Sequence, residues 1–227
     1  MKITEIFYKI FCVISLTYAA IGDKITIVIN NICYFFGEGM PAKRLITEDK
    51  ILEAALQTVR ERGFEALNMR DLAKKCSCST QPIYLCFGSA EKLKCAVAKK
   101  IAQAFNEFIE NQIKSGEFPE YKAIGMGYIR FAAEEKEFFK YLFMRNRTEE
   151  AEFEKDSFDK STFIIMKNLG LYKDDAYLLH AEMWIFVHGI AAMIATGYQK
   201  WDGELISRML TDAYKGFISQ IKNGGNK

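Results

Sequence analysis

The sequence predicts an all-α fold. Only 3 of the 227 residues are proline and half of all residues are apolar. Helix-favouring residues such as Ala, Leu, Lys and Glu are abundant, and apolar residues recur at helical spacing along most of the chain. A chain of this length and apolar content can bury a substantial core. We therefore expect a globular protein built from helices.

The first 39 residues differ from the rest of the chain. They contain two uncharged stretches, Ile10 to Gly22 and Ile25 to Gly37, each of about 13 residues, which is short of the roughly 18 needed to span a bilayer. The first stretch resembles the apolar core of a signal peptide. Alternatively, Gly37-Glu38-Gly39 can be encoded by a purine-rich ribosome-binding sequence. We favour this second interpretation, in which residues 1–39 are an upstream extension and translation begins at Met40.

The first helix is expected between Thr47 and Gly63. Thr47 can cap its amino end, and the acidic residues Glu48 and Asp49 complement the helix dipole. Gly63 suits the left-handed position that ends a helix. The apolar positions recur with the helical period, at Ile51, Leu52, Ala55, Leu56 and Val59.

Two short helices joined by a three-residue turn follow. Asn68 caps the first, Met69 to Cys76, and Ser77-Cys78-Ser79 forms a polar turn that leads into the second, Thr80 to Cys86. Pro82 is compatible with the start of the second helix, because the amide hydrogen it lacks would have no intrahelical partner there. This arrangement, from Asn68 to Phe87, is a helix-turn-helix.

Charge is distributed unevenly along the chain. Residues 40–100 hold 12 Lys and Arg against 7 Asp and Glu, a surplus of +5, whereas residues 101–227 hold 16 against 19, a balance of −3. The basic part is expected to meet a polyanion and the acidic part to have another role. A charged surface that binds no partner is the alternative.

A helix-turn-helix places its second helix in the major groove of DNA, with the N-terminal residues toward the bases. Thr80, Gln81 and Leu85 are therefore expected to face base edges, beside Pro82. Gln81 can form two hydrogen bonds with adenine, and Leu85 can contact a thymine methyl group. Phosphate contacts that set the register are expected from Asn68, Arg70, Tyr84, Ser89 and Lys92. Lys43 and Arg44 would form a short basic arm beside the DNA.

Several segments resemble the tetracycline-repressor (TetR/AcrR) family of transcriptional regulators, in the same order and spacing. The resemblance covers roughly residues 46–97. The segments that carry it are Ile51-Leu52-x-Ala54-Ala55, Arg62-Gly63-Phe64, Met69-Arg70-Asp71-Leu72-Ala73 and Ile83-Tyr84-x-x-Phe87-Gly88-Ser89.

Three positions depart from the pattern of that family. Ser77 stands where glycine is usual, Leu85 where histidine or another polar residue is frequent, and Ala90 where a phosphate-binding lysine is common. Leu85 and Ala90 predict altered DNA specificity. Lys92 and Lys94 would supply part of the positive charge missing at position 90.

The second half continues as helices. A long amphipathic helix over 90–114 connects the two halves until Ser115-Gly116 interrupts it, and no phosphate-binding loop or catalytic motif stands out. We expect a helix-turn-helix domain at 40–90 and a helical effector-binding and dimerisation domain at 91–227, and no enzyme. Further helices are expected at 121–134, 136–147, 149–169, 173–196 and 202–222.

The second-to-last helix carries Met183-Trp184-x-x-Val187-His188-Gly189. It resembles the Trp/His-Gly (WHG-type) signature of one TetR-type C-terminal domain. The resemblance implies that the last two long helices pair with their copies in a second subunit, so the protein would be a homodimer. The small residues of this segment also permit close helix packing, which ordinary core packing explains equally well.

Aromatic residues are dense in the second half, and most must belong to the core. Some could line a cavity for an apolar or aromatic small molecule, and the expected lining residues are Tyr128, Phe131, Phe143, Met166, Trp184 and His188. A metal site is not expected, because His180 and His188 point about 80° apart around a helix. Cys76 and Cys78 have neither CxxC spacing nor a neighbouring histidine. No cofactor is expected.

Together these features predict a cytoplasmic, nucleoid-associated regulator, most simply a repressor. It would bind a palindromic operator in double-stranded DNA as a homodimer and be released by a small-molecule effector. Two alternatives remain: a helical small-molecule-binding protein or enzyme that does not bind DNA, and a regulator tethered to the membrane through residues 1–39.

Overall fold

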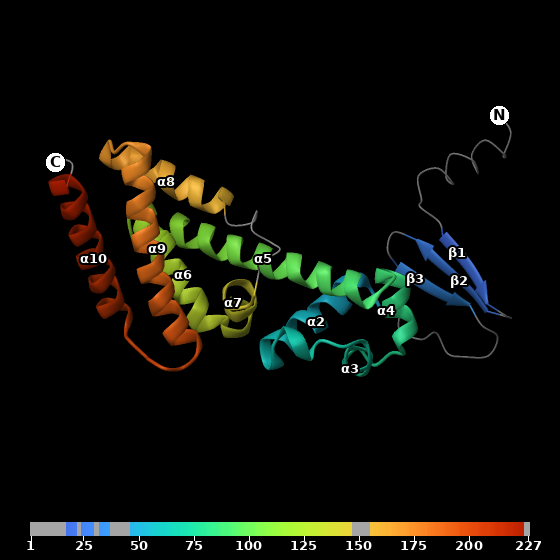
Figure 1. Ribbon diagram of the computed structural model, residues 1–227. Coiled ribbons are helices and arrows are strands. Elements are labelled where there is room, and N and C mark those ends of the chain that lie inside the picture. Colours follow the sequence, from blue (N-terminus) through green and yellow to red (C-terminus); the bar gives the residue numbers. More distant parts are fainter. Residues whose placement is uncertain (1–16, 22–23, 30–31, 37–45, 147–154, 225–227) are drawn as a thin grey trace, which may run out of the picture. The chain divides into compact units, whose positions relative to one another are not determined.

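The computed structural model describes residues 17–21, 24–29, 32–36, 46–146 and 155–224 (Figure 1). The chain divides into two compact units, residues 1–100 and 101–227. Met40 and the predicted basic arm, Lys43 and Arg44, lie outside the described residues. The predicted start of translation therefore stays a prediction.

The first unit begins with three antiparallel strands, β1 (Thr17–Ile21), β2 (Lys24–Ile29) and β3 (Ile32–Phe36). They pair in chain order, with Tyr18 opposite Ile27 and Ile27 opposite Tyr34. These strands differ from the expectation, in which the two uncharged stretches belong to a signal peptide or an upstream extension. Ile, Val, Thr, Tyr and Phe dominate both stretches, and these residue types also favour strands.

From Glu48 onward, all regular structure in the described residues is helical, which confirms the predicted all-α fold for that part of the chain. In the first unit, each α-helix buries apolar side chains, whereas the short 3-10 helix buries none. The fully buried ones include Ile51, Val59, Ile83 and Val97. The helices are α2 (Glu48–Arg62), the 3-10 helix η1 (Phe64–Ala66), α3 (Met69–Lys75), α4 (Thr80–Phe87) and the start of α5 (Ala90–Lys114).

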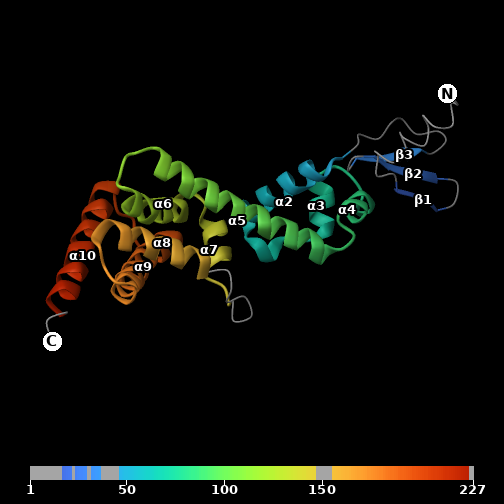
Figure 2. The ribbon, with the colours of Figure 1, turned by 90° about the horizontal axis from the view of Figure 1, so that it is seen from above.

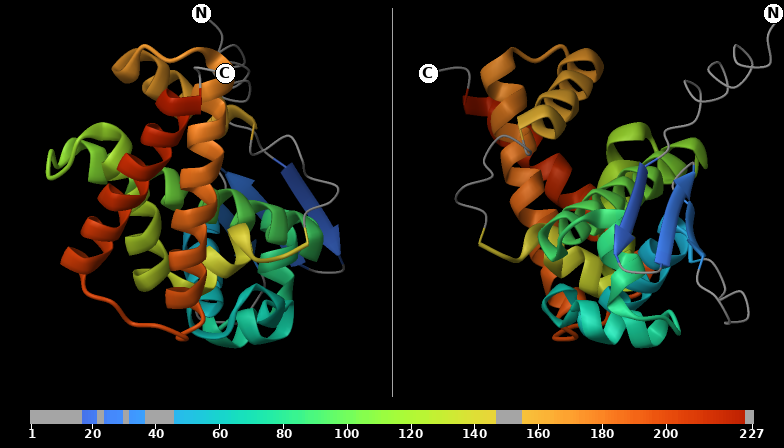
Figure 3. Two further views of the ribbon diagram at one scale, coloured as in Figure 1. Left: turned by 60° about the vertical axis from the view of Figure 1, so that its left-hand side comes forward. Right: turned by 90° about the vertical axis from the view of Figure 1, so that its right-hand side faces the viewer.

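The second unit consists of the remainder of α5 and five further helices. The central α9 packs against α6, α8 and α10 (Figure 3), and Phe131, Phe138, Phe139 and Leu179 are fully buried. The five helices are α6 (Glu120–Glu134), α7 (Lys136–Phe143), α8 (Lys155–Leu169), α9 (Lys173–Ala195) and α10 (Gly203–Gly224) (Figure 2).

Most helix bounds agree with the sequence prediction within one or two residues, but α7 does not. It was expected to reach residue 147 and ends at Phe143. The Arg145 side chain donates a hydrogen bond from Nε to the carbonyl oxygen of Tyr141 at 2.8 Å, which is one way to satisfy a carbonyl at a helix end. The predicted beginning of the next helix, 149–154, lies outside the described residues.

Helix α9 is apolar on almost all sides. Among the described residues it is the one helix long and apolar enough to cross a membrane, although 44% of its most apolar window is buried inside the structure. A helix that is apolar all round belongs either to a membrane or to a core that covers it on several sides. Contacts with four neighbouring helices show that α9 is the central helix of this unit.

Candidate functional site

Helix α4 has one buried and one exposed face. Ile83 is fully buried and Phe87 is 8% exposed, which anchors one side of the helix in the core of the first unit. On the other side, Gln81 is exposed, Tyr84 is 45% exposed and Leu85 is 37% exposed. These three residues are spaced i, i+3 and i+4, so they form one outward surface. We call Gln81, Tyr84 and Leu85 the α4 face.

Other members of the predicted DNA-binding set lie on the same pair of short helices and at the start of α5. Thr80 and Pro82 occupy the first turn of α4 and are half-buried. Arg70 on α3 and Lys92 on α5 are exposed. The Lys92 amino group lies beside Gly88, 3.8 Å from where a Cβ on that glycine would stand. It therefore adds positive charge near the carboxyl end of α4.

Two residues predicted to bind phosphate also cap helices. The Asn68 side chain accepts a hydrogen bond from the Asp71 amide at 2.9 Å, which caps α3, and its Nδ2 donates to Asp71 Oδ2 and to the Ala66 carbonyl oxygen. Ser89 Oγ accepts from the Lys92 amide at 3.1 Å at the start of α5. Both caps hold the ends of helices that a DNA backbone would meet.

The turn between α3 and α4 is a Schellman motif. The Cys78 amide donates to the Ala73 carbonyl oxygen and the Ser77 amide donates to that of Lys74, both at 3.0 Å. Such a turn needs a left-handed residue between the two helices, a position that normally favours glycine. Ser77 occupies it with φ +52° and is the one non-glycine residue with positive φ in the described part of the chain. The strained backbone conformation therefore falls on Ser77, which stands where glycine is usual in the TetR/AcrR pattern.

Ion pairs that the sequence analysis missed tie α3 to α2. Lys75 Nζ lies 3.0 Å from Glu61 Oε2, and Arg62 Nη1 lies 3.8 Å from Asp71 Oδ2. Hydrogen bonding from Asn68, followed by Lys74 and Arg62, lowers the pKa of Asp71. Because all four charges are partly or well exposed, these pairs orient α3 more than they stabilise it. The paired residues are 9 and 14 positions apart and lie on different helices, so the periodicity within one helix does not indicate that they meet.

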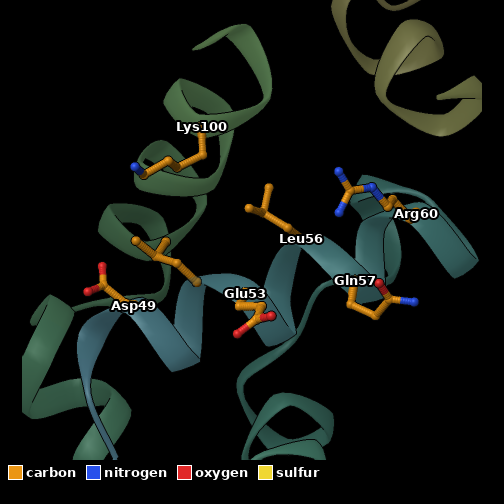
Figure 4. Close-up of a pocket in the computed structure, with 7 residues that line it drawn as sticks. Asp49, Glu53, Leu56, Gln57, Arg60 and Lys100 are labelled. Atoms are coloured by element: carbon orange, nitrogen blue, oxygen red, sulfur yellow. The ribbon is translucent and has the colours of Figure 1, made fainter. Parts of the chain in front are cut away.

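A hollow lies between α2 and the first part of α5, where Lys100 faces it (Figure 4). Its volume is about 270 Å³, and Leu52 and Leu56 lie between acidic and basic side chains. None of the predicted binding residues lines it. The complete lining is Asp49, Leu52, Glu53, Leu56, Gln57, Arg60 and Lys100.

In the second unit, most of the predicted ligand-binding residues come together in one aromatic cluster. The Phe105 ring contacts Tyr128, Phe131 and Phe143, with ring centroids 5.9, 5.1 and 5.1 Å away. Tyr128 and Phe143 also contact each other at 4.9 Å. Phe131 is almost completely buried, whereas Phe143 is half-buried. Phe131 is therefore a core residue of this cluster, and Phe143 lies nearer its surface.

Trp184 and His188 complete the cluster from α9. Their rings stack at a 14° angle with centroids 5.2 Å apart, one helical turn from each other, and both are half-buried. His188 Nδ1 and Tyr128 Oη share a hydrogen bond of 3.0 Å. Met166 lies on a different helix, α8, where it is half-buried. The Trp/His segment thus presents a flat aromatic surface with a polar edge.

A second tyrosine–histidine pair joins the same two helices. Tyr121 Oη and His180 Nδ1 share a hydrogen bond of 2.9 Å, and the Tyr121 ring also contacts Tyr214 on α10. His180 is only 8% exposed, and burial lowers its pKa to about 4. Burial also raises the pKa of Tyr121. The pair is therefore neutral, and its place in the core was not predicted.

Comparison with known proteins agrees with this geometry. Residues 51–96, which span α2 to the first part of α5, match the family described as bacterial regulatory proteins, tetR family. The match coincides with the helix-turn-helix and the helices on either side of it. The search of curated proteins gave no match.

Solved structures with a similar fold match most of the chain. A TetR-like transcriptional regulator from Rhodococcus sp. RHA1 has a TM-score of 0.60 at 18% identity, over 76% of this chain and 95% of that one. A transcriptional regulator from Aquifex aeolicus VF5 has 0.53 at 17% identity, over 74% and 96%. A TetR variant from Acinetobacter baumannii AYE in complex with minocycline has 0.51 at 16% identity, over 78% and 98%. At these identities the likeness establishes the fold.

Replacing Ser77 by glycine should stabilise this TetR-family domain. A left-handed conformation costs a non-glycine residue about 1 kcal/mol, so Ser77→Gly is expected to raise the free energy of unfolding by about that amount. Urea denaturation measures the change. Ser77→Ala is the control, because it removes the hydroxyl and keeps the strained φ. Equal stabilities of the two variants would contradict the explanation.

His180 should make the protein less stable in mild acid. As pH falls from 6.5 towards 4, the unfolded chain protonates this histidine while the buried side chain stays neutral, so stability is lost in that window. The loss is about 1.4 kcal/mol for each unit by which the two pKa values differ. His180→Gln should remove this part of the pH dependence, measured by urea denaturation at pH 7.5 and 5.

Tyr121→Phe is the control for His180. It deletes the hydrogen bond, which costs about 1 kcal/mol at every pH, and leaves the buried histidine in place. Its loss of stability between pH 7.5 and 5 should therefore match that of the wild type. An unchanged pH dependence in His180→Gln would show that other groups cause the acid sensitivity.

Proposed function

We propose that this TetR-family protein is a ligand-responsive repressor that binds a palindromic DNA operator as a homodimer. The observation that carries the proposal is the α4 face. A short helix held by Ile83 and Phe87 presents Gln81, Tyr84 and Leu85 outward, beside the exposed cations Arg70 and Lys92. A short helix with polar and apolar side chains exposed on one face is suited to the major groove.

The charge of the first unit supports the same role. Residues 40–100 carry a surplus of five positive charges, and residues 101–227 are slightly acidic. Lys and Arg next to the α4 face would attract phosphate, and Ser89 and Asn68 stand at helix ends where phosphate oxygens commonly bind. Phosphate contacts of this kind supply affinity, whereas the α4 face supplies sequence preference.

Dimerisation is supported by an apolar face on α9 that the rest of the chain leaves exposed. Leu178 is 49% and Ile185 is 65% exposed, and Gly189 follows one turn later with open space where a Cβ would stand. Separations of seven, four and three residues place one side chain after another on the same side of the helix, which carries Leu178, Ile185, Gly189 and Ala192. An exposed apolar stripe with small residues permits close packing against a second helix. A second copy of α9 and α10 is the occupant we propose.

A dimer would also explain how one short helix can recognise a long operator. Two copies of α4 bound in successive major grooves must lie about 34–36 Å apart, and the operator must repeat its half-site with the symmetry of the protein. An effector would release the DNA by binding better to a conformation in which this spacing differs.

The aromatic cluster of the second unit is the proposed effector site. Trp184 and His188 form a flat stacked surface, and the hydrogen bond from His188 to Tyr128 fixes the orientation of both rings. Stacked rings with few polar groups favour a planar aromatic ligand. The Acinetobacter baumannii TetR structure contains minocycline, a ligand of that protein.

Binding to DNA is tested first with duplexes selected by the protein from a random pool. Gln81→Ala should lower the affinity for the selected duplex by about ten- to a hundredfold and leave the binding of unrelated DNA unchanged. Lys92→Ala should weaken the binding of the selected duplex and of unrelated DNA to a similar extent. It should also reduce the number of counterions released on binding by about one per subunit, which lowers the salt dependence of the affinity. Fluorescence anisotropy over a salt series measures these effects. Failure of the wild type to enrich any sequence would refute the proposal.

Dimerisation is tested by introducing glutamate at two exposed apolar positions, one in each of two variants. Ile185→Glu should dissociate the dimer, because a carboxylate would be buried without a partner in the proposed interface. Phe163→Glu on α8 is the control, since Phe163 is also 65% exposed but lies on another helix. Sedimentation velocity should show monomers for Ile185→Glu alone. Dimers in both variants would exclude the α9 face as the interface.

The effector site is tested by thermal shift with a set of planar aromatic compounds. A compound that binds the folded protein raises its melting temperature, and at equal concentration a tighter ligand raises it more. Trp184→Ala should abolish the shift, and Tyr128→Phe, which keeps the ring and loses the hydrogen bond to His188, should reduce it. DNA affinity without the compound should stay unchanged in Tyr128→Phe. A full shift in Trp184→Ala would place the ligand elsewhere.

A further inference from the structure

The recognition helix α4 contains no charged residue. Its eight residues are Thr80, Gln81, Pro82, Ile83, Tyr84, Leu85, Cys86 and Phe87. Guanine is most often recognised by Arg or Lys through O6 and N7, and cytosine by Asp or Glu through its amino group. Helix α4 therefore lacks the side chains that usually recognise a G·C pair.

Two residues of the α4 face match an A·T pair instead. The Gln81 amide can donate to N7 and accept from the amino group of adenine. Leu85 is an apolar side chain on an otherwise polar exposed face, and it is 37% exposed. In the major groove, the apolar group available to cover it is the 5-methyl of thymine.

The two residues are also close enough to address neighbouring base pairs. Gln81 and Leu85 are four residues apart on one face, about 6 Å along the helix axis. Base pairs are separated by about 3.4 Å along one strand. The adenine and the thymine methyl would therefore lie within about two base-pair steps.

The nearest cations are placed differently. Arg70 belongs to α3, and the Lys92 amino group lies beside Gly88, after the last turn of α4. At the two ends of the motif they can neutralise phosphates without reaching the bases that face Gln81 and Leu85.

We propose that α4 specifies A·T pairs, with Gln81 recognising adenine and Leu85 the 5-methyl group of thymine. This inference rests on the proposed DNA-binding function and adds the base class that the half-site must contain. It also makes a methyl group in the DNA a direct contributor to affinity.

The test begins with the duplex that the full-length protein selects from a random pool. Each thymine of the half-site is then replaced by uracil, which keeps all hydrogen-bonding groups and removes only the methyl. Loss of one buried methyl group corresponds to about a fourfold loss of affinity per half-site, or about fifteenfold for both half-sites. One thymine position should show this loss of affinity. An adenine should lie within two base-pair steps of it, and replacing this adenine by 7-deazaadenine should also weaken binding.

Protein variants connect each base to its residue. Leu85→Ala should bind the thymine and uracil duplexes equally, and Gln81→Ala should bind the adenine and 7-deazaadenine duplexes equally. Lys92→Ala is the control. It should bind every duplex more weakly but still prefer thymine to uracil and adenine to 7-deazaadenine. Thermal denaturation confirms that each variant is folded, and the exposed positions of Leu85 and Gln81 make this the expected result.

The outcomes separate this inference from the proposed function. Selection of a half-site whose core is G·C would overturn the inference and leave DNA binding established. Equal uracil effects in the wild type and Leu85→Ala would also overturn it. A protein that selects no sequence would refute the proposed function itself.

Discussion

The orientation of α4 depends on two buried side chains. An eight-residue helix is too short to be stable alone, so tertiary packing must hold it. Ile83 and Phe87 provide that packing from one side of α4. Their burial determines that Gln81, Tyr84 and Leu85 face outward. Every property attributed to the α4 face follows from this constraint.

The turn before α4 shows a different compromise. A Schellman turn sets the angle between the two short helices, and it requires a left-handed residue at position 77. Serine adopts this conformation at an energetic cost. Both hydrogen bonds of the turn form with serine in this position, so the motif keeps its geometry without glycine.

In the second unit, α9 has to satisfy two demands. One side packs against α6, α8 and α10, and two tyrosine–histidine hydrogen bonds join it to α6 about two turns apart. Another side exposes Leu178 and Ile185 next to Gly189. A helix that must be apolar on both sides shows weak amphipathic periodicity, which explains why it also resembles a membrane span in composition.

The sequence by itself determined the helical fold after residue 47, the bounds of the helix-turn-helix and its resemblance to the TetR/AcrR family. These depend on local signals: caps, apolar spacing, and motifs within about twenty residues of each other. Local signals did not reveal the strands at 17–36, the early end of α7 at Phe143, or the ion pairs from α3 to α2. Those features depend on pairing between segments or on a single side-chain contact.

Only the tertiary structure decided which aromatic residues belong to one cluster and which histidine is buried. Tyr128 and His188 are 60 residues apart, and Tyr121 and His180 are 59 apart, so no periodicity within one helix could pair them. The sequence placed His188 among the residues expected to line a cavity and did not distinguish the burial of the two histidines, whereas the structure half-buries His188 and buries His180 more deeply. Burial is a property of how helices pack, and a single helix does not specify its neighbours.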